Sequence, residues 1–297
     1  MQFRAGFATA LLAICTVATP PLAGGGQIEL VQCLYSIPTI VGTRGNDVLL
    51  GTPRDDVIAG LGGDDVIYGD GGNDLICGGD GDDRIFSGLW LFESDAVSGD
   101  GGNDVIIAGA TLTTVVYELA PSPVSVDLDA RTASGWGSDI LVGVFSVVGS
   151  EHDDTLRGST EINCLYGLHG DDVLQGLDGD DCLTGGPGND SLDGGAGTDV
   201  VSFAHAGART TVNLATGSAR GDGVDRLAAI EQLVGSSLPD VLTGDAGSNE
   251  IRGGGGADRM AGGPGTDRLD GGDGRDRVDG GVGRDRCLNA ELRRRCP

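Results

Sequence analysis

The sequence predicts an all-β fold, a parallel β-solenoid assembled from nine-residue units. Glycine opens every unit, aspartate stands sixth in sixteen of the eighteen units, and Leu, Ile or Val stands eighth in sixteen. The units begin at Gly42, Gly51, Gly60, Gly69, Gly78, Gly99, Gly149, Gly158, Gly167, Gly176, Gly185, Gly194, Gly235, Gly244, Gly253, Gly262, Gly271 and Gly280. They cover more than half of the 297 residues. A period that is fixed over this length indicates a repeat architecture.

Each unit divides into a turn and a short strand. Positions one to six are rich in glycine and acidic residues, and positions seven to nine alternate outward, inward and outward, as in a half-buried strand. One apolar side chain in nine residues cannot form a globular core. We therefore expect two units to form one coil, with their strands facing each other and the coils stacked on their neighbours.

The turn residues predict a bound cation. Glycine supplies positive φ in a tight turn and lets the backbone approach an ion closely. Coils stack about 4.8 Å apart, so Asp47 and Asp65, which are eighteen residues apart, would lie directly above one another. A hard divalent cation removes the repulsion in such a column. Carboxylate and carbonyl oxygens suit Ca²⁺ better than Mg²⁺, which demands a tighter octahedron.

Two units, GGPGNDSLD from Gly185 and GGAGTDVVS from Gly194, resemble the RTX (repeats-in-toxin) calcium-binding nonapeptide G-G-x-G-x-D-x-U-x. The resemblance implies a parallel β-roll of an exported bacterial protein, with Ca²⁺ between turns. Its ligands would be turn carbonyls and the sixth-position carboxylates of Asp47, Asp56, Asp65, Asp74, Asp83, Asp104, Asp154, Asp172, Asp181, Asp190, Asp199, Asp240, Asp258, Asp267, Asp276 and Asp285. Asn163 and Asn249 replace the aspartate in the two remaining units, where we expect weak sites.

The net charge of −26 argues against a nucleic-acid partner, because polyanions repel each other. The C-terminal end is the exception, with arginine at the seventh position of four units: Arg259, Arg268, Arg277 and Arg286. This basic ladder is either a surface for an acidic glycan or membrane, or a solvated face whose arginines pair with Asp270 and Asp279. We favour the solvated face, since exposed charge runs are common.

The N-terminus predicts a signal peptide over residues 1–23, and therefore a secreted chain. Arg4 supplies the positive end, and the stretch from Ala5 to Ala18 is apolar but too short to span a membrane. No later stretch is long enough either, so no transmembrane segment is expected. A lipid anchor at Cys15 is the lesser alternative, because the bulky Ile14 precedes the cysteine.

Six cysteines remain after the signal peptide, an even number that favours disulfides in an exported chain. Cys164 and Cys182 both occupy the seventh position eighteen residues apart, so coils of two units place them about one strand spacing apart, close enough to bond. Cys287 can pair with Cys296 over the last coil. That leaves Cys33 for Cys77.

We expect eight segments: signal peptide 1–23, N-terminal cap 24–41, first repeat array 42–107, first spacer 108–148, second array 149–202, second spacer 203–234, third array 235–288 and C-terminal cap 289–297. The two spacers share a pattern, in which Val126, Leu128, Asp139 and Leu141 match Val212, Leu214, Asp225 and Leu227. Each is expected to be a β-rich module that continues the solenoid. A ligand-binding bulge is the alternative.

No enzyme is predicted. The chain lacks the HExxH, GxSxG and GxxxxGK[ST] motifs, and its close carboxylate pairs follow the repeat register. A pore-forming toxin is disfavoured, because the chain has no lysine to acylate and no long apolar region. Calcium ions are the expected partner and cofactor of a structural or adhesive extracellular module, whose surface ligand the sequence does not identify. The alternative is an extracellular hydrolase with its site in a spacer.

Overall fold

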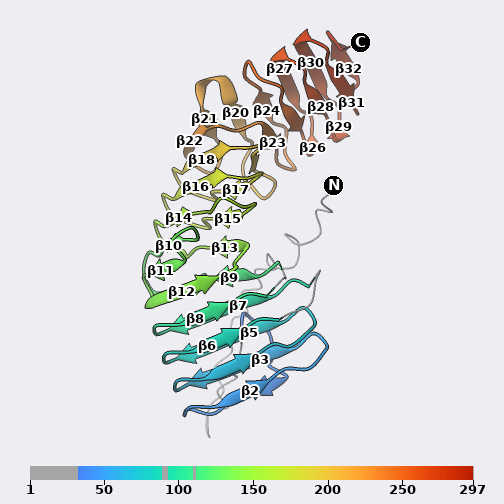
Figure 1. Cartoon of the computed structure of the whole chain (residues 1–297). Coiled ribbons are helices and arrows are strands. Elements are labelled where there is room, and N and C mark those ends of the chain that lie inside the picture. The colour runs from blue at the N-terminus through green and yellow to red at the C-terminus, as the bar shows by residue number, and fades with distance from the viewer. Residues whose placement is uncertain (1–32, 89–92, 110–111, 297) are drawn as a thin grey trace, which may run out of the picture. The chain divides into compact units, whose positions relative to one another are not determined.

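The computed structural model describes residues 33–88, 93–109 and 112–296. The predicted signal peptide and the lipid-anchor alternative at Cys15 lie outside these residues. Within them the chain forms two large sheets of thirteen and seventeen strands, whose successive strands are visible in Figure 1. The described part contains no α-helix, only the three-residue 3-10 helix η1 (Leu214–Thr216), and hence no helix that could cross a membrane.

The first sheet runs in chain order. Its strands are β1 (Ile40–Val41), β3 (Val57–Gly62), β5 (Leu75–Asp80), β7 (Ala96–Gly101), β9 (Thr114–Val116), β13 (Ser146–Val148), β15 (Cys164–Tyr166), β17 (Cys182–Thr184), β19 (Val200–Ser202), β23 (Gln232–Val234), β25 (Glu250–Arg252), β28 (Arg268–Asp270) and β31 (Arg286–Leu288).

The second sheet contains the intervening strands. In spatial order these are β2 (Val48–Leu50), β4 (Val66–Tyr68), β6 (Arg84–Phe86), β8 (Val105–Ile107), β12 (Ser138–Val142), β11 (Thr132–Ser134), β10 (Ser125–Asp127), β14 (Thr155–Arg157), β16 (Val173–Asp178), β18 (Ser191–Ala196), β22 (Val224–Ala228), β21 (Ser218–Arg220), β20 (Thr211–Asn213), β24 (Val241–Thr243), β27 (Arg259–Gly265), β30 (Arg277–Gly283) and β32 (Leu292–Arg294). A small pair, β26 (Gly255–Gly256) and β29 (Asp273–Gly274), links two turns.

Strands eighteen residues apart pair in parallel. Ile58 lies beside Ile76, and Leu165 lies beside Leu183. Because consecutive strands alternate between the two sheets, each coil consumes two nine-residue units. The predicted parallel β-solenoid with two units per coil is confirmed.

In the repeat arrays the core consists of two facing columns of eighth-position side chains, one from each sheet. Ile67, Ile76, Leu174 and Leu183 are completely buried. Their neighbours at positions seven and nine are more exposed, as the alternation of strand residues requires. The core is therefore thin, and each coil depends on the coils above and below it.

The spacers continue both sheets, but not in a wholly parallel way. In the first spacer the chain runs through β10, reverses into β11 and reverses again into β12, so that β11 is antiparallel to both neighbours. β12 then stacks on β8 and β10 on β14, both in parallel. Tight turns cause the reversals: in the first, Asp127 Oδ1 accepts a hydrogen bond from the N–H of Ala130 at 2.8 Å.

The second spacer repeats this arrangement with β20, β21 and β22. Its first reversal is the helix η1, which Asn213 caps by accepting a hydrogen bond from the N–H of Thr216 at 3.1 Å. Each spacer is thus a three-stranded meander inserted into the second sheet, where a regular coil would contribute one strand.

The three expected disulfides form, and the spacing of the repeat predicts the first of them. Cys164 and Cys182 lie on paired strands with their Cα atoms 4.6 Å apart. Cys33–Cys77 and Cys287–Cys296 have Cα separations of 5.6 Å and 5.8 Å. The Cys164–Cys182 bond supports the eighteen-residue coil independently, because a coil of one unit would place these residues about two strand spacings apart.

Candidate metal centre

The sixth-position aspartates form a ladder of hydrogen bonds along each turn stack. The main-chain N–H of Asp65 donates to Oδ1 of Asp83 at 2.8 Å, and that of Asp83 donates to Oδ1 of Asp104 at 2.9 Å. The N–H of Asp172 likewise donates to Oδ1 of Asp190 at 3.0 Å. Oδ1 of each of these aspartates therefore bonds to the preceding coil, and this contact fixes the orientation of Oδ2 in the same carboxylate.

Five acidic residues outside the predicted ligand set make the same contact. They are Asp95, Asp139, Asp225, Glu231 and Glu291, which accept from the N–H groups of Asp74, Asp104, Asp190, Asp199 and Asp276. Four of them stand two residues before a buried aliphatic residue of a strand, as Asp139 does before Leu141. This pattern, an acidic residue two positions before an aliphatic one, can be found in the sequence if a unit is not required to carry glycine at its first and fourth positions.

The second carboxylate oxygen is buried without a hydrogen-bond donor in most units. Among the described residues of the predicted ligand set this holds for Oδ2 of Asp65, Asp74, Asp83, Asp104, Asp172, Asp181, Asp199, Asp258, Asp267, Asp276 and Asp285. A buried carboxylate oxygen without a partner is costly. These eleven oxygens therefore need a positively charged partner when ionised.

The first-position glycines make room beside these oxygens. A Cβ on Gly78 would lie 2.2 Å from Asp83 Oδ2 and 2.8 Å from the carbonyl oxygen of Gly99 in the next coil. The corresponding Cβ on Gly176 would lie 2.3 Å from Asp181 Oδ2. These first-position glycines do not have positive φ, so close approach to neighbouring atoms requires glycine here. The expected positive φ occurs instead at the second and fourth positions of the turns, as at Gly79 and Gly81.

Burial raises the pKa of these carboxyl groups. Desolvation raises the pKa of Asp104 to about 8, against the hydrogen bond from the N–H of Asp83 and with the charges of Asp139 and Asp83. It likewise raises the pKa of Asp83 and Asp172 to about 7, with smaller contributions from neighbouring carboxylates. The turn stacks thus resist holding negative charge near neutral pH without a counter-ion.

The calcium-free chain should consequently become less stable as pH rises. A carboxyl whose pKa is raised from 3.8 to about 7 or 8 stabilises the fold below its unfolded pKa, and this contribution is lost as pH rises through the folded value. In excess EDTA we expect more β signal in circular dichroism at about pH 5, where these carboxyls are protonated, than at about pH 8, where they are ionised. Asp104→Asn should reduce this difference, and a β signal that rises over the same interval would contradict the expectation.

The donor set fits calcium. In ten turns a donor-free carboxylate oxygen and a carbonyl oxygen of the next coil both lie within 3 Å of the Cβ position of one first-position glycine, and hard oxygen ligands of this kind suit Ca²⁺. In the part of the chain that the structure describes, no three His, Cys, Asp or Glu side chains cluster as a metal site. Main-chain carbonyls would therefore complete the coordination, as the family resemblance implies.

Five of the sixteen predicted ligands lack a donor-free buried Oδ2. Asp190 keeps the same turn geometry, with Oδ2 2.1 Å from the Cβ position of Gly185. The carboxylates of Asp47, Asp56, Asp154 and Asp240 instead accept hydrogen bonds from the second residue of their own turn.

One spacer carboxylate accepts a hydrogen bond from a tyrosine on its second oxygen. The buried Tyr117 hydroxyl donates to Asp139 Oδ2 at 2.8 Å, and Asp139 Oδ1 accepts from Asp104. Both oxygens of Asp139 are therefore bonded, although Asp139 occupies the sixth-position register.

Tyr117→Phe should destabilise the first spacer, because it leaves a buried carboxylate oxygen without a donor. We expect a loss of about 1–3 kcal/mol in the free energy of unfolding at saturating calcium, measured by urea denaturation. Tyr68→Phe is the matched control, since Tyr68 is partly exposed and its ring stacks on Phe86. Equal stability of the two variants would contradict the role given to the Tyr117 hydroxyl.

The C-terminal basic ladder does not pair as expected. Asp279 binds Arg294 and Arg295, and Asp270 accepts a hydrogen bond from Asn289 at 2.7 Å. Arg268 instead lies 3.7 Å from Glu250 on the neighbouring strand. The expected pairing of the ladder with Asp270 and Asp279 is wrong because the C-terminal strand β32 and its flanking residues take these carboxylates.

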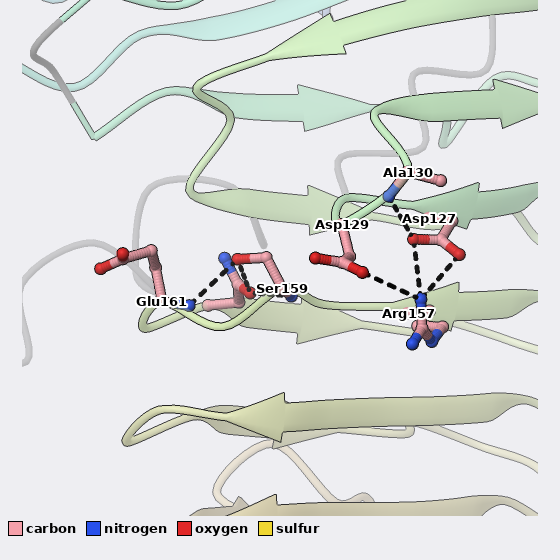
Figure 2. Close-up of polar contacts among 7 residues, drawn as sticks. Asp127, Asp129, Ala130, Arg157, Ser159 and Glu161 are labelled. Carbon is pink, nitrogen blue, oxygen red and sulfur yellow. Dashed lines mark hydrogen bonds and ion pairs between the residues drawn. The ribbon is translucent and has the colours of Figure 1, made fainter.

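The first spacer carries a separate ion cluster. Figure 2 shows Arg157 of β14 reaching Asp127 and Asp129 across the end of β10, with Nη1–oxygen distances of 2.9 Å to Asp127 and 3.8 Å to Asp129. Asp127 also borders a shallow depression over β10–β12, together with Ser125, Thr132 and Ser138. Its carboxylate is engaged by Arg157, so the depression supplies no observation in favour of a hydrolase site.

Comparison with known proteins agrees with the turn geometry. The model of the RTX calcium-binding nonapeptide repeat matches residues 39–52, 50–85, 93–110, 148–181, 166–201, 234–269 and 258–287, which is more than half of the chain. No curated protein matches the chain. The matched segments contain the ladder of aspartates and the glycines beside it. The chain therefore belongs to the RTX calcium-binding nonapeptide repeat family.

Proposed function

We propose that this chain is an exported structural module that folds on binding Ca²⁺ between its turns. The observation that carries the proposal is the set of buried, donor-free Oδ2 atoms, ten of which lie, together with a main-chain carbonyl oxygen of the next coil, around the Cβ position of a first-position glycine. Calcium supplies the positive charge that these oxygens lack. The chain's own contribution is to hold Oδ1 in the ladder, so that Oδ2 is preoriented toward the ion.

Export is supported by the predicted signal peptide and by the three disulfides, because disulfides persist in oxidising compartments. A structural or adhesive role is supported by the proportion of the chain devoted to repeats and by the long, exposed faces of both sheets. We further propose that the ions order these faces for contact with an extracellular partner.

A calcium titration tests the proposed function. Full-length chain in calcium-free buffer should gain β signal in circular dichroism as Ca²⁺ rises to about 10⁻⁴–10⁻³ M, the range of extracellular calcium modules. Calorimetry should show several ions bound per chain. Mg²⁺ at the same concentrations should give a smaller change. Absence of bound calcium, or an equal response to Mg²⁺, would overturn the proposal.

A further inference from the structure

The turns fall into two structural classes. Twelve units have positive φ at the second position, even where the residue is Leu61, Asp100 or Leu177, and we name these open turns. The other six have no positive φ at positions two or four, and we name these closed turns. The closed turns are the units from Gly42, Gly51, Gly149, Gly158, Gly235 and Gly244, which are the first two units of each array.

In a closed turn the second residue satisfies the sixth-position side chain. Ser236 donates its N–H to Asp240 Oδ2 at 2.7 Å and its hydroxyl to the same oxygen at 2.9 Å. Thr210 donates its N–H to Asp240 Oδ1 at 2.7 Å. Both carboxylate oxygens are therefore occupied, whereas Oδ2 of Asp258, one coil later, has no donor.

The second residue also closes its own loop. Ser159 Oγ accepts from the N–H of Glu161 at 3.2 Å (Figure 2). The N–H of Ser159 donates to Asn163 Oδ1 at 2.6 Å. Such side-chain bonds to nearby backbone groups replace the left-handed second residue of an open turn.

Every departure from the repeat at positions four and six lies in a closed turn. These departures are Arg54, His152, Glu161 and Leu238 at position four, and Asn163 and Asn249 at position six. Glycine is dispensable at position four because φ is not positive there. Asparagine is tolerated at position six because its amide takes neutral hydrogen bonds, such as that from Asn163 Nδ2 to the carbonyl of Phe145 at 3.2 Å.

We infer that each array opens with a coil that takes no calcium, and that its ion sites begin one coil later. This inference rests on the proposed function and specifies where that function is absent. Covalent bonding supports it in the second array, where the Cys164–Cys182 disulfide joins the closed turn from Gly158 to the open turn from Gly176. The disulfide thus links the first two coils of the array, between which the inference places no calcium ion.

A matched pair of substitutions tests the inference. Asp154 and Asp172 are equally buried and adjacent in one ladder, with the N–H of Asp154 donating to Asp172 Oδ1 at 2.8 Å. Asp154 lies in a closed turn and Asp172 in an open one. In calcium calorimetry on the full chain, Asp172→Asn should weaken at least one ion site tenfold or more. Asp154→Asn should leave affinity and stoichiometry unchanged.

Opening a closed turn provides the converse test. Ser150→Gly with His152→Gly removes the hydroxyl and supplies both glycines of an open turn while keeping Asp154, so the doubly substituted chain should bind one additional Ca²⁺. A loss of affinity in Asp154→Asn equal to that in Asp172→Asn, or no additional ion in the double variant, would overturn the inference. An unaltered chain that binds no calcium would instead refute the proposed function and this inference with it.

Discussion

Excess EDTA is expected to unfold the repeat arrays of the full-length chain. At a few millimolar calcium and a dissociation constant of ~10⁻⁴ M, one site adds about 2 kcal/mol to the folded state. The second array has four open turns, so it gains on the order of 8 kcal/mol, which is comparable to the whole stability of an ordinary domain. The thin core of single eighth-position side chains cannot replace this contribution.

Circular dichroism with and without EDTA checks this expectation. The β signal should fall on chelation and return when calcium is added back, whereas added Mg²⁺ should restore it poorly. The disulfides remain intact throughout, so refolding should be reversible. A β spectrum that stays unchanged in excess EDTA would contradict the calcium-dependent stability of the arrays.

The period of the sequence was sufficient to predict the coil. Because Leu165 and Leu183 recur at the same position eighteen residues apart, they had to face one core from adjacent coils, and the structure pairs them. The same register placed Cys164 beside Cys182. These predictions succeeded because in a solenoid, sequence separation converts directly into distance.

The spacer topology could not be predicted in this way. Val126 and Leu141 show the alternation of strands, but alternation does not reveal direction. The antiparallel β11 depends on two short reversals, one of them held by the bond from Ala130 to Asp127, and such local turn chemistry leaves only a weak sequence signal.

The nine-residue period also did not predict the distinction between open and closed turns. Asn163 stood out as an irregularity, and the sequence predicted a weak site there. The cause lies in the second position, which holds Ser159 in a closed turn and Leu177 at φ +84° in an open one. The family pattern tolerates many residues at that position, so only the backbone conformation separates the two classes.

Alanine at the fourth position should have opposite consequences in the two classes of turn. Gly170, in an open turn, has φ +129°, and an added Cβ would lie 2.5 Å from the main-chain carbonyl carbon and oxygen of His152. Backbone cannot move aside as a flexible side chain can. The left-handed conformation alone costs an L-residue about 1–2 kcal/mol, and with the clash we expect Gly170→Ala to lose about 3 kcal/mol or more.

Gly45 occupies the same position of a closed turn, and the nearest atom to an added Cβ is Thr43 Oγ1 at 3.9 Å. Gly45→Ala should therefore change the free energy of unfolding by no more than about 0.5–1 kcal/mol, in the stabilising direction, because alanine restricts the unfolded chain. Urea denaturation of both variants at saturating calcium measures the difference. Arg54, His152 and Leu238 already place side chains at this position of other closed turns. Equal losses in the two variants would mean that the fourth position is under the same constraint in every turn, and the division into two classes would fail.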